Sequence, residues 1–254
     1  MNDATGNTIA KVPAVTAGFW LIKIAATTLG ETGGDAVTMS MGLGYLVGTA
    51  IFAVIFAVAV AWQIRARDFH PFLYWTTVVA STAVGTTLAD FADRSLGIGY
   101  TGGASLLLAL LLASLWLWRR TLGSVSVESV GDTPSELFYW MTVMFSQTLG
   151  TALGDWFSDT AGFGYLGSAV VFGVALLAVW FLHLRTQVSK TALFWAAFIL
   201  TRPLGAVVGD FLDKPVAQGG LALSRYSASA VLLVAIVAMI VLLPQKPARI
   251  AARA

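Results

Sequence analysis

The chain has no cysteine and only two histidines among its 254 residues. The absence of cysteine excludes disulfides and thiolate metal sites. Charged residues make up 11% of the chain, against roughly 25% in an average soluble domain. Hydrophobic residues reach 57%, and the mean hydropathy is +0.81. This composition excludes an ordinary soluble domain and predicts an all-α integral membrane protein.

Four tryptophans head four copies of one pattern. Each tryptophan is followed ten residues later by a glycine and fifteen residues later by an aspartate, with no gap inside any copy. Self-similarity at a fixed register indicates a repeat protein. The matched residues are Trp20, Gly30 and Asp35; Trp75, Gly85 and Asp90; Trp140, Gly150 and Asp155; and Trp195, Gly205 and Asp210.

Long apolar runs predict eight transmembrane helices in one membrane domain, 1–254. We place them at about 15–34, 42–64, 71–91, 101–118, 136–157, 164–184, 191–212 and 226–243. Paired, they give four tandem two-helix repeats at about 15–66, 70–120, 135–186 and 190–244, with a polar linker at 121–134. The tryptophans lie 55, 65 and 55 residues apart, which predicts two pseudo-twofold halves built from parallel hairpins.

Basic residues set the expected orientation. Arg94, Lys214 and Arg225 fall in the turns within repeats, while ten others fall at the termini or between repeats. The positive-inside rule therefore predicts that both termini are cytoplasmic, with the tryptophans as anchors at the cytoplasmic interface. The ten are Lys11, Arg65, Arg67, Arg119, Arg120, Arg185, Lys190, Lys246, Arg249 and Arg253.

A polar stripe follows one face of the first helix of each repeat. Positions three, seven, eleven and fifteen after each tryptophan are four apart and so share a helical face. In the first repeat they are Lys23, Thr27, Glu31 and Asp35. Lipid offers such polar groups no hydrogen-bond partners, so the stripe must face protein or water. Small-residue pairs such as Gly30 and Gly34 predict close helix packing, which would bring the carboxylates together.

Gathered carboxylates in an apolar bundle need protons, cations or basic partners. We therefore expect a transporter of a hard cation that is exported against protons. The leading candidate is a divalent metal such as Mn²⁺. Carboxylates and neutral oxygens also suit Mg²⁺ and Ca²⁺, and no covalent cofactor is expected. Lys23 and Arg202 would balance charge. The candidate metal-binding acids are Glu31, Asp35, Asp90, Asp155 and Asp210, and the candidate neutral ligands are Thr86, Gln147 and Thr151.

Two other interpretations stay open. Lys23 and Arg202 would bind the substrate directly if it were a small organic or anionic solute. Alternatively, the protein transports nothing, and the aspartates only stabilise the bundle or cap the turns between helices. The second acids Asp93, Asp159 and Asp213 are expected to be solvated.

An enzyme is disfavoured, because the chain shows no nucleophile–base pair or phosphate loop, and its two histidines are remote from the acids. Nothing indicates nucleic-acid binding. The expected partners are the lipid bilayer and the transported ion or solute, and the oligomeric state stays open.

The chain resembles a family of bacterial integral membrane proteins built from four tandem two-helix repeats, each with a characteristic tryptophan. The Phe-Trp and Tyr-Trp pairs ending at Trp20, Trp75, Trp140 and Trp195 and the segment 28–35 carry the resemblance. It covers nearly the whole chain and implies a bacterial inner-membrane location and a four-repeat architecture. Its acid-and-glycine motifs are similar to the Glu-x-Gly-Asp segments of small cation exporters.

Overall fold

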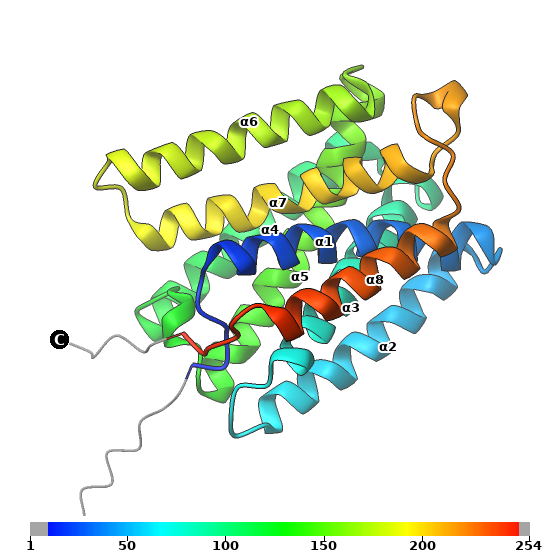
Figure 1. Cartoon of the computed structure of the whole chain (residues 1–254). Helices are drawn as coiled ribbons and strands as arrows, with labels where there is room; N and C mark the ends of the chain where they lie inside the picture. Colours follow the sequence, from blue (N-terminus) through cyan, green and yellow to red (C-terminus); the bar gives the residue numbers. More distant parts are fainter. Residues whose placement is uncertain (1–9, 249–254) are drawn as a thin grey trace, which may run out of the picture.

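The computed structural model describes residues 10–248, and Arg249 and Arg253 of the predicted cytoplasmic charges lie outside them. Eight α-helices dominate the described residues (Figure 1). They are α1 (Ala17–Asp35), α2 (Gly44–Arg65), α3 (Pro71–Asp90), α4 (Gly99–Leu122), α5 (Thr133–Asp155), α6 (Gly164–Arg185), α7 (Lys190–Asp213) and α8 (Arg225–Leu242). The short turns are η1 (Ala36–Ser40), η2 (Phe91–Ser95), η3 (Val127–Ser129), η4 (Trp156–Thr160) and η5 (Val216–Gln218).

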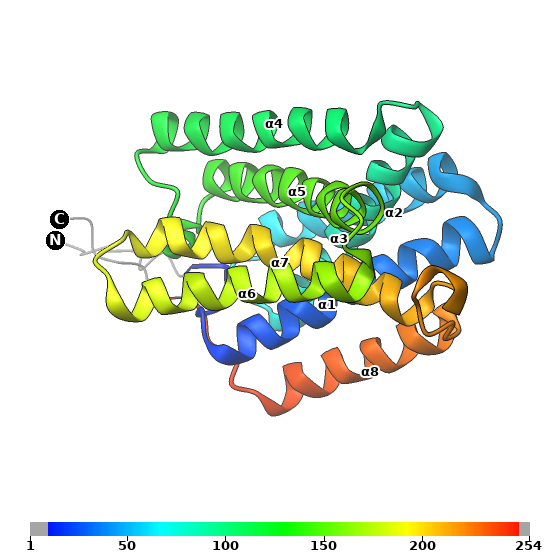
Figure 2. The same ribbon diagram turned by 90° about the horizontal axis from the view of Figure 1, so that it is seen from above.

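The four odd-numbered helices form a closed inner ring. Helix α1 packs against α3 and α7, and α5 packs against the same two neighbours. The contacts run in register from the tryptophans to the aspartates, so these helices are parallel. Each of them begins at the end of the molecule where the described part of the chain starts and finishes, at residues 10 and 248 (Figures 1 and 2).

Each even-numbered helix covers the inner helix of the next repeat. Helix α2 packs on α3, α4 on α5, α6 on α7, and α8 closes the circle on α1. An isolated repeat would therefore leave its apolar surface uncovered, as in other repeat architectures. The repeats form one interlocked domain.

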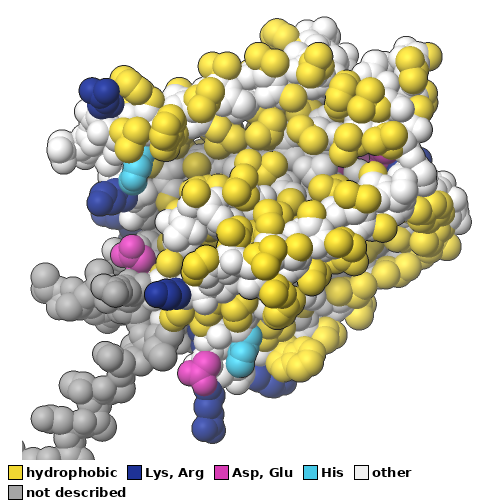
Figure 3. All heavy atoms as spheres, viewed as in Figure 1, with side chains coloured by type: hydrophobic (Ala, Val, Ile, Leu, Met, Phe, Trp, Pro, Cys, Tyr) yellow, Lys and Arg dark blue, Asp and Glu magenta, His cyan; other side chains and the backbone are white. Residues whose placement is uncertain are grey.

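The outer helices present the membrane surface. Five helices are long and apolar enough to cross a membrane, namely α2, α4, α6, α7 and α8. Helices α1, α3 and α5 do not meet that standard, so only five of the eight expected apolar spans are confirmed. Their lower hydropathy has a physical reason: they belong to the inner ring and are covered by outer helices, so fewer of their side chains need to contact lipid. Figure 3 shows the apolar band, with most Lys and Arg side chains in view toward the end that carries the termini.

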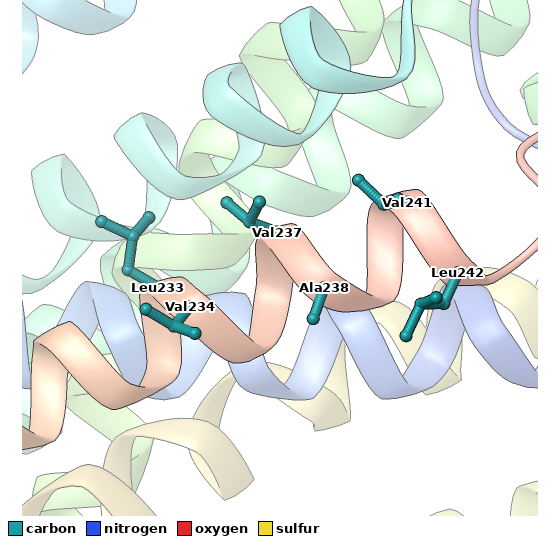
Figure 4. A pocket seen from close by; sticks show the side chains of 6 residues that line it. All are labelled: Leu233, Val234, Val237, Ala238, Val241 and Leu242. Carbon is teal, nitrogen blue, oxygen red and sulfur yellow. The ribbon is translucent and has the colours of Figure 1, made fainter.

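A shallow groove on α8 belongs to this outer surface (Figure 4). Its side chains are all apolar and point away from the inner ring, so the groove is separate from the polar stripe. They are Leu233, Val234, Val237, Ala238, Val241 and Leu242.

Glycine sets how closely the inner helices approach. A Cβ atom on Gly30 of α1 would overlap the side chain of Thr82 on α3, and one on Gly205 of α7 would overlap Thr27 on α1. Gly85 and Gly150 meet the same register position of the next helix, Gln147 and Arg202. The glycine ten residues after each tryptophan thus lets every adjacent pair of inner helices touch.

Aromatic rings close the end of the bundle near the termini. The ring before each tryptophan contacts the next tryptophan around the circle. Three of the four tryptophans are at most 4% exposed, so the expectation that they anchor the protein at the lipid interface is wrong. They face the ring because their helices are internal. The contacting pairs are Phe19 and Trp75 (5.4 Å), Tyr74 and Trp140 (5.7 Å), Tyr139 and Trp195 (6.2 Å), and Phe194 and Trp20 (5.7 Å).

Candidate functional site

The predicted polar stripes meet inside the ring as a column of four layers. Every member is at most 3% exposed. The outer layer is Asp35, Asp90, Asp155 and Asp210; the second is Glu31, Thr86, Thr151 and Ala206; the third is Thr27, Thr82, Gln147 and Arg202; and the fourth, next to the aromatic rings, is Lys23, Val78, Val143 and Phe198.

The aspartates of the first and last repeats share one lysine. Lys214 Nζ lies 2.6 Å from Asp35 Oδ2 and 3.0 Å from Asp210 Oδ1. Asp213 adds a third carboxylate, and the three acids can bring ligand atoms within 4.8 Å of one another. Arg225, at the start of α8, lies 2.9 Å from Asp213 and 3.7 Å from Asp35. These five residues form the first half-site.

The aspartates of the middle repeats share one arginine. Arg94 Nε lies 2.9 Å from Asp90 Oδ1, and its Nη2 lies 3.3 Å from Asp155 Oδ2. Asp93 lies beside them against Gly103 of α4, and neither of its carboxylate oxygens has a hydrogen-bond partner among the described residues. Asp90, Asp93, Arg94 and Asp155 form the second half-site. The carboxylates therefore collect as two half-sites within one layer.

The half-sites follow the predicted pseudo-twofold relation. Lys214 and Arg94 each stand nineteen residues after a tryptophan, in the fourth and second repeats. Each also follows its own layer aspartate by four residues, the spacing at which helical side chains meet. That spacing is the signal in the sequence that marks these two bases as site residues, beyond the loop charges that the positive-inside rule counts.

Net charge distinguishes the half-sites from simple ion pairs. In the first, three carboxylates face two basic side chains, and Asp35 Oδ1 and Asp213 Oδ1 are buried without a partner among the described residues. In the second, Asp90 and Asp155 pair with one guanidinium, and Asp93 lies close enough to feel its charge. Each half-site therefore carries excess negative charge when its acids are ionised.

The bases hold their charge. Burial alone would lower the pKa of Lys214, but Asp210, Asp35 and Asp213 raise it above its ordinary value. Burial likewise opposes the charge of Arg94, yet Asp90 and Asp155 raise its pKa. The neighbouring carboxylates therefore favour the positively charged form of both side chains.

Burial overturns part of the expectation for the second acids. Asp159 is exposed as predicted, but Asp93 and Asp213 are each only 7% exposed. Each packs against the helix that follows it. Asp93 lies against Gly103 of α4, and Asp213 pairs with Arg225 at the start of α8.

The layer aspartates do not cap the outer helices. Helices α2, α4 and α6 begin after Leu43, Ile98 and Phe163, with no capping side-chain hydrogen bond. Glycines with positive φ make the tight turns before them, including Gly42 at +69° and Gly44 at +76°. The capping interpretation is therefore wrong, and the turns form through backbone geometry alone.

The guanidinium of Arg202 contacts the polar side chains of the second layer. Its Nη1 lies 3.1 Å from Glu31 Oε2. Its Nη2 donates to Thr86 Oγ1 at 2.6 Å and to Thr151 Oγ1. Thr86 also donates to Glu31 Oε2 at 3.2 Å. The predicted ligands Glu31, Thr86 and Thr151 thus lie together, one layer below the aspartates, engaged by the guanidinium.

The fourth-layer lysine has a different environment. Lys23 Nζ donates to Gln147 Oε1 at 3.4 Å and lies 4.1 Å from the centre of the Phe198 ring. Among the described residues no carboxylate lies within 4.0 Å of its amine. Arg202 balances an acid as predicted, but Lys23 does not, because its helical position is two turns below Glu31.

Comparison with known proteins agrees with the repeat pattern. No curated protein and no solved structure matches the chain. The pattern described as Repeat of Unknown Function (DUF347) matches four times, at 18–69, 73–124, 138–189 and 193–243. These matches cover most of the chain and coincide with the four helix pairs of the structure. The chain therefore belongs to the DUF347 repeat family as a membrane protein with four tandem repeats.

Proposed function

We propose that this protein is a secondary transporter that exchanges a hard cation, such as Mn²⁺, for protons. The observation that carries the proposal is the excess of buried carboxylate over basic groups in the two half-sites. Asp35 and Asp213 each keep one buried oxygen without a partner among the described residues. A buried charge is tolerated only when it is paired or bound to a metal.

The basic side chains define where the ion would bind. Lys214 holds its amine at hydrogen-bond distance from Asp35 and Asp210. Oxygen ligands hold Mg²⁺ or Ca²⁺ at about 2.0–2.6 Å, so a metal ion can replace an ammonium between the same carboxylates. Because the pKa of Lys214 is raised, its amine does not need to lose a proton before the ion binds. The ion instead displaces the charged amine from the carboxylates.

Protons complete the exchange. When the cation leaves, carboxylates in excess of the bases must take up protons, since unpaired buried charge is costly. The layer is reached from the end opposite the termini, where Arg94 and Arg225 are partly exposed. Below it, Arg202 and Lys23 repel cations and the aromatic rings close the bundle. We therefore propose that the cation enters and leaves the layer from this end.

The same proposal includes the membrane topology. All eight helices cross the bilayer, with α1, α3 and α5 shielded from lipid by the others. Both termini lie in the cytoplasm of a bacterial inner membrane. This orientation places the half-sites at the periplasmic side, as the distribution of Lys and Arg indicates.

Transport by purified protein in proteoliposomes tests the proposal. Mn²⁺, Mg²⁺ and Ca²⁺ are offered with and without a pH gradient, to wild type, Asp35→Asn and Asp155→Asn. Asp159→Asn is the matched control, because Asp159 is exposed in the equivalent turn. We expect gradient-dependent cation movement that both buried variants lose and the control keeps.

The competing interpretations give other results. If the acids only stabilise the bundle, wild type moves none of the cations, and Asp35→Asn merely lowers the thermal unfolding temperature. If the substrate is an organic or anionic solute, neutralising Lys23 or Arg202 harms transport more than neutralising the aspartates. Either result would overturn cation exchange at the half-sites.

A further inference from the structure

The lower part of the column is rich in hydrogen-bond donors and poor in acceptors. Lys23 is fully buried, and its amine makes one long hydrogen bond, to Gln147, besides its contact with the Phe198 ring. An ammonium has three donors, so most of its capacity is unused. The ring face stabilises the positive charge only in part.

Two neighbouring side chains add unpaired donors. Gln147 Nε2 and Arg202 Nε are both buried, and neither has an acceptor among the described residues. Rotating the Gln147 amide would not help, because it would turn a donor toward the lysine. Gln147 and Arg202 stand at the same register position on α5 and α7, and Arg202 is close enough to repel Lys23. Three helices thus contribute donors to one region.

Charge is also uncompensated here. Glu31 neutralises Arg202, so a protonated Lys23 would carry a positive charge that no carboxylate pairs among the described residues. The aspartates of the outer layer lie twelve residues further along their helices than Lys23, at about 1.5 Å per residue. A water molecule would accept the hydrogen bonds but would leave this charge in place.

We propose that Lys23 Nζ, Gln147 Nε2 and Arg202 Nε form a buried site for a small monovalent inorganic anion of halide size. A single negative charge beside the amine would hold this buried lysine in its protonated form. The close approach of the inner helices at Gly85 and Gly150 leaves no space for an extended organic acid. The site is separate from the aspartate layer, so anion binding there does not depend on cation transport.

Thermal unfolding of the purified protein tests the site. Unfolding is measured in sodium chloride, sodium bromide and sodium gluconate at equal ionic strength, for wild type, Lys23→Met and Lys190→Met. Lys190 is exposed and controls for loss of a lysine. A ligand that binds only the folded state raises the melting temperature. We expect halide to raise it by a few degrees in wild type and Lys190→Met, and to have no effect in Lys23→Met.

A bromide anomalous difference map of wild-type crystals gives a second measurement that needs no folded variant. We expect a peak within hydrogen-bond distance of Lys23 Nζ and Gln147 Nε2. A melting temperature independent of halide in wild type would overturn the proposal. So would equal halide dependence in Lys23→Met, or a map in which only water lies beside the lysine.

Discussion

At the scale of single residues, the column is an arrangement of buried charges that are stable only together. Arg202 is fully buried and depends on Glu31, Thr86 and Thr151 for its hydrogen bonds. Burial of an ion pair brings little net stability, but removal of one partner strands the other charge. Glu31 therefore has a definite role as the partner of Arg202, whatever ion the outer layer binds.

Because the two charges are coupled, we predict that the effects of their substitutions on the free energy of unfolding are far from additive. Arg202→Met leaves Glu31 unpaired, and Glu31→Gln leaves Arg202 unpaired, so each should lower the free energy of unfolding by about 3–5 kcal/mol. The double variant should lose less than the sum, because neither charge remains. Thermal unfolding in detergent micelles, analysed as a double-mutant cycle, measures the coupling. Additive losses would show that the two charges do not depend on each other.

At the scale of helices, the fold is held by small residues at a repeated register. Interhelical hydrogen bonds accompany them: Thr82 Oγ1 donates to Ala26 O, and Thr27 Oγ1 donates to Thr201 O, both at 3.2 Å. Such contacts replace the hydrophobic effect, which does not drive association between helices in lipid. The inner ring is therefore sensitive to single added methyl groups.

Gly30→Ala tests this sensitivity directly. The new Cβ would overlap the side chain of Thr82, and overpacking of this kind costs about 1–3 kcal/mol. Gly173→Ala on α6 is the matched control, because nothing lies within 4 Å of its added Cβ. We expect a lower melting temperature for Gly30→Ala and an unchanged or higher one for Gly173→Ala. Equal melting temperatures would show that the helix approach at Gly30 is not tight.

The helices and the stripe could be predicted from the sequence because they are periodic. The tryptophan register placed the aspartates, Glu31 and Arg202 on one face, and the structure buries all of them inside the ring. The bases Arg94, Lys214 and Arg225 were missed as site residues. They lie beyond the ends of the predicted apolar runs. Continuation of helix past the aspartates brings Arg94 and Lys214 to the layer, and Arg225 reaches it from the first turn of α8.

At the scale of the whole molecule, the arrangement around the circle could not be predicted. A hairpin suggests that its two helices pack on each other, yet α2 covers α3, and α8 covers α1. Each outer helix packs on the next repeat because the ring closes. The residue pattern within a single repeat does not indicate this closure. The same closure lets the three inner helices α1, α3 and α5 be less apolar than the five candidate membrane spans.

The lack of cysteine allows a clean test of topology, since any introduced cysteine is unique. Leu96 follows η2 near the half-sites, and Val188 lies between α6 and α7 at the opposite end; both are exposed. In intact cells, a membrane-impermeant maleimide should label Leu96→Cys, whereas Val188→Cys should react only after permeabilisation. The reverse pattern would place the termini outside the cytoplasm.

Equilibrium dialysis of Mn²⁺ with wild type, Lys214→Met and Asp35→Asn tests most directly whether the first half-site takes a cation in place of its lysine. Removing the resident ammonium should tighten binding by about tenfold or more, which corresponds to about 1.4 kcal/mol. Removing the Asp35 charge should weaken it by a similar factor, and Lys190→Met should match wild type. Equal Mn²⁺ affinity in wild type and Lys214→Met, or no binding by either, would contradict the account.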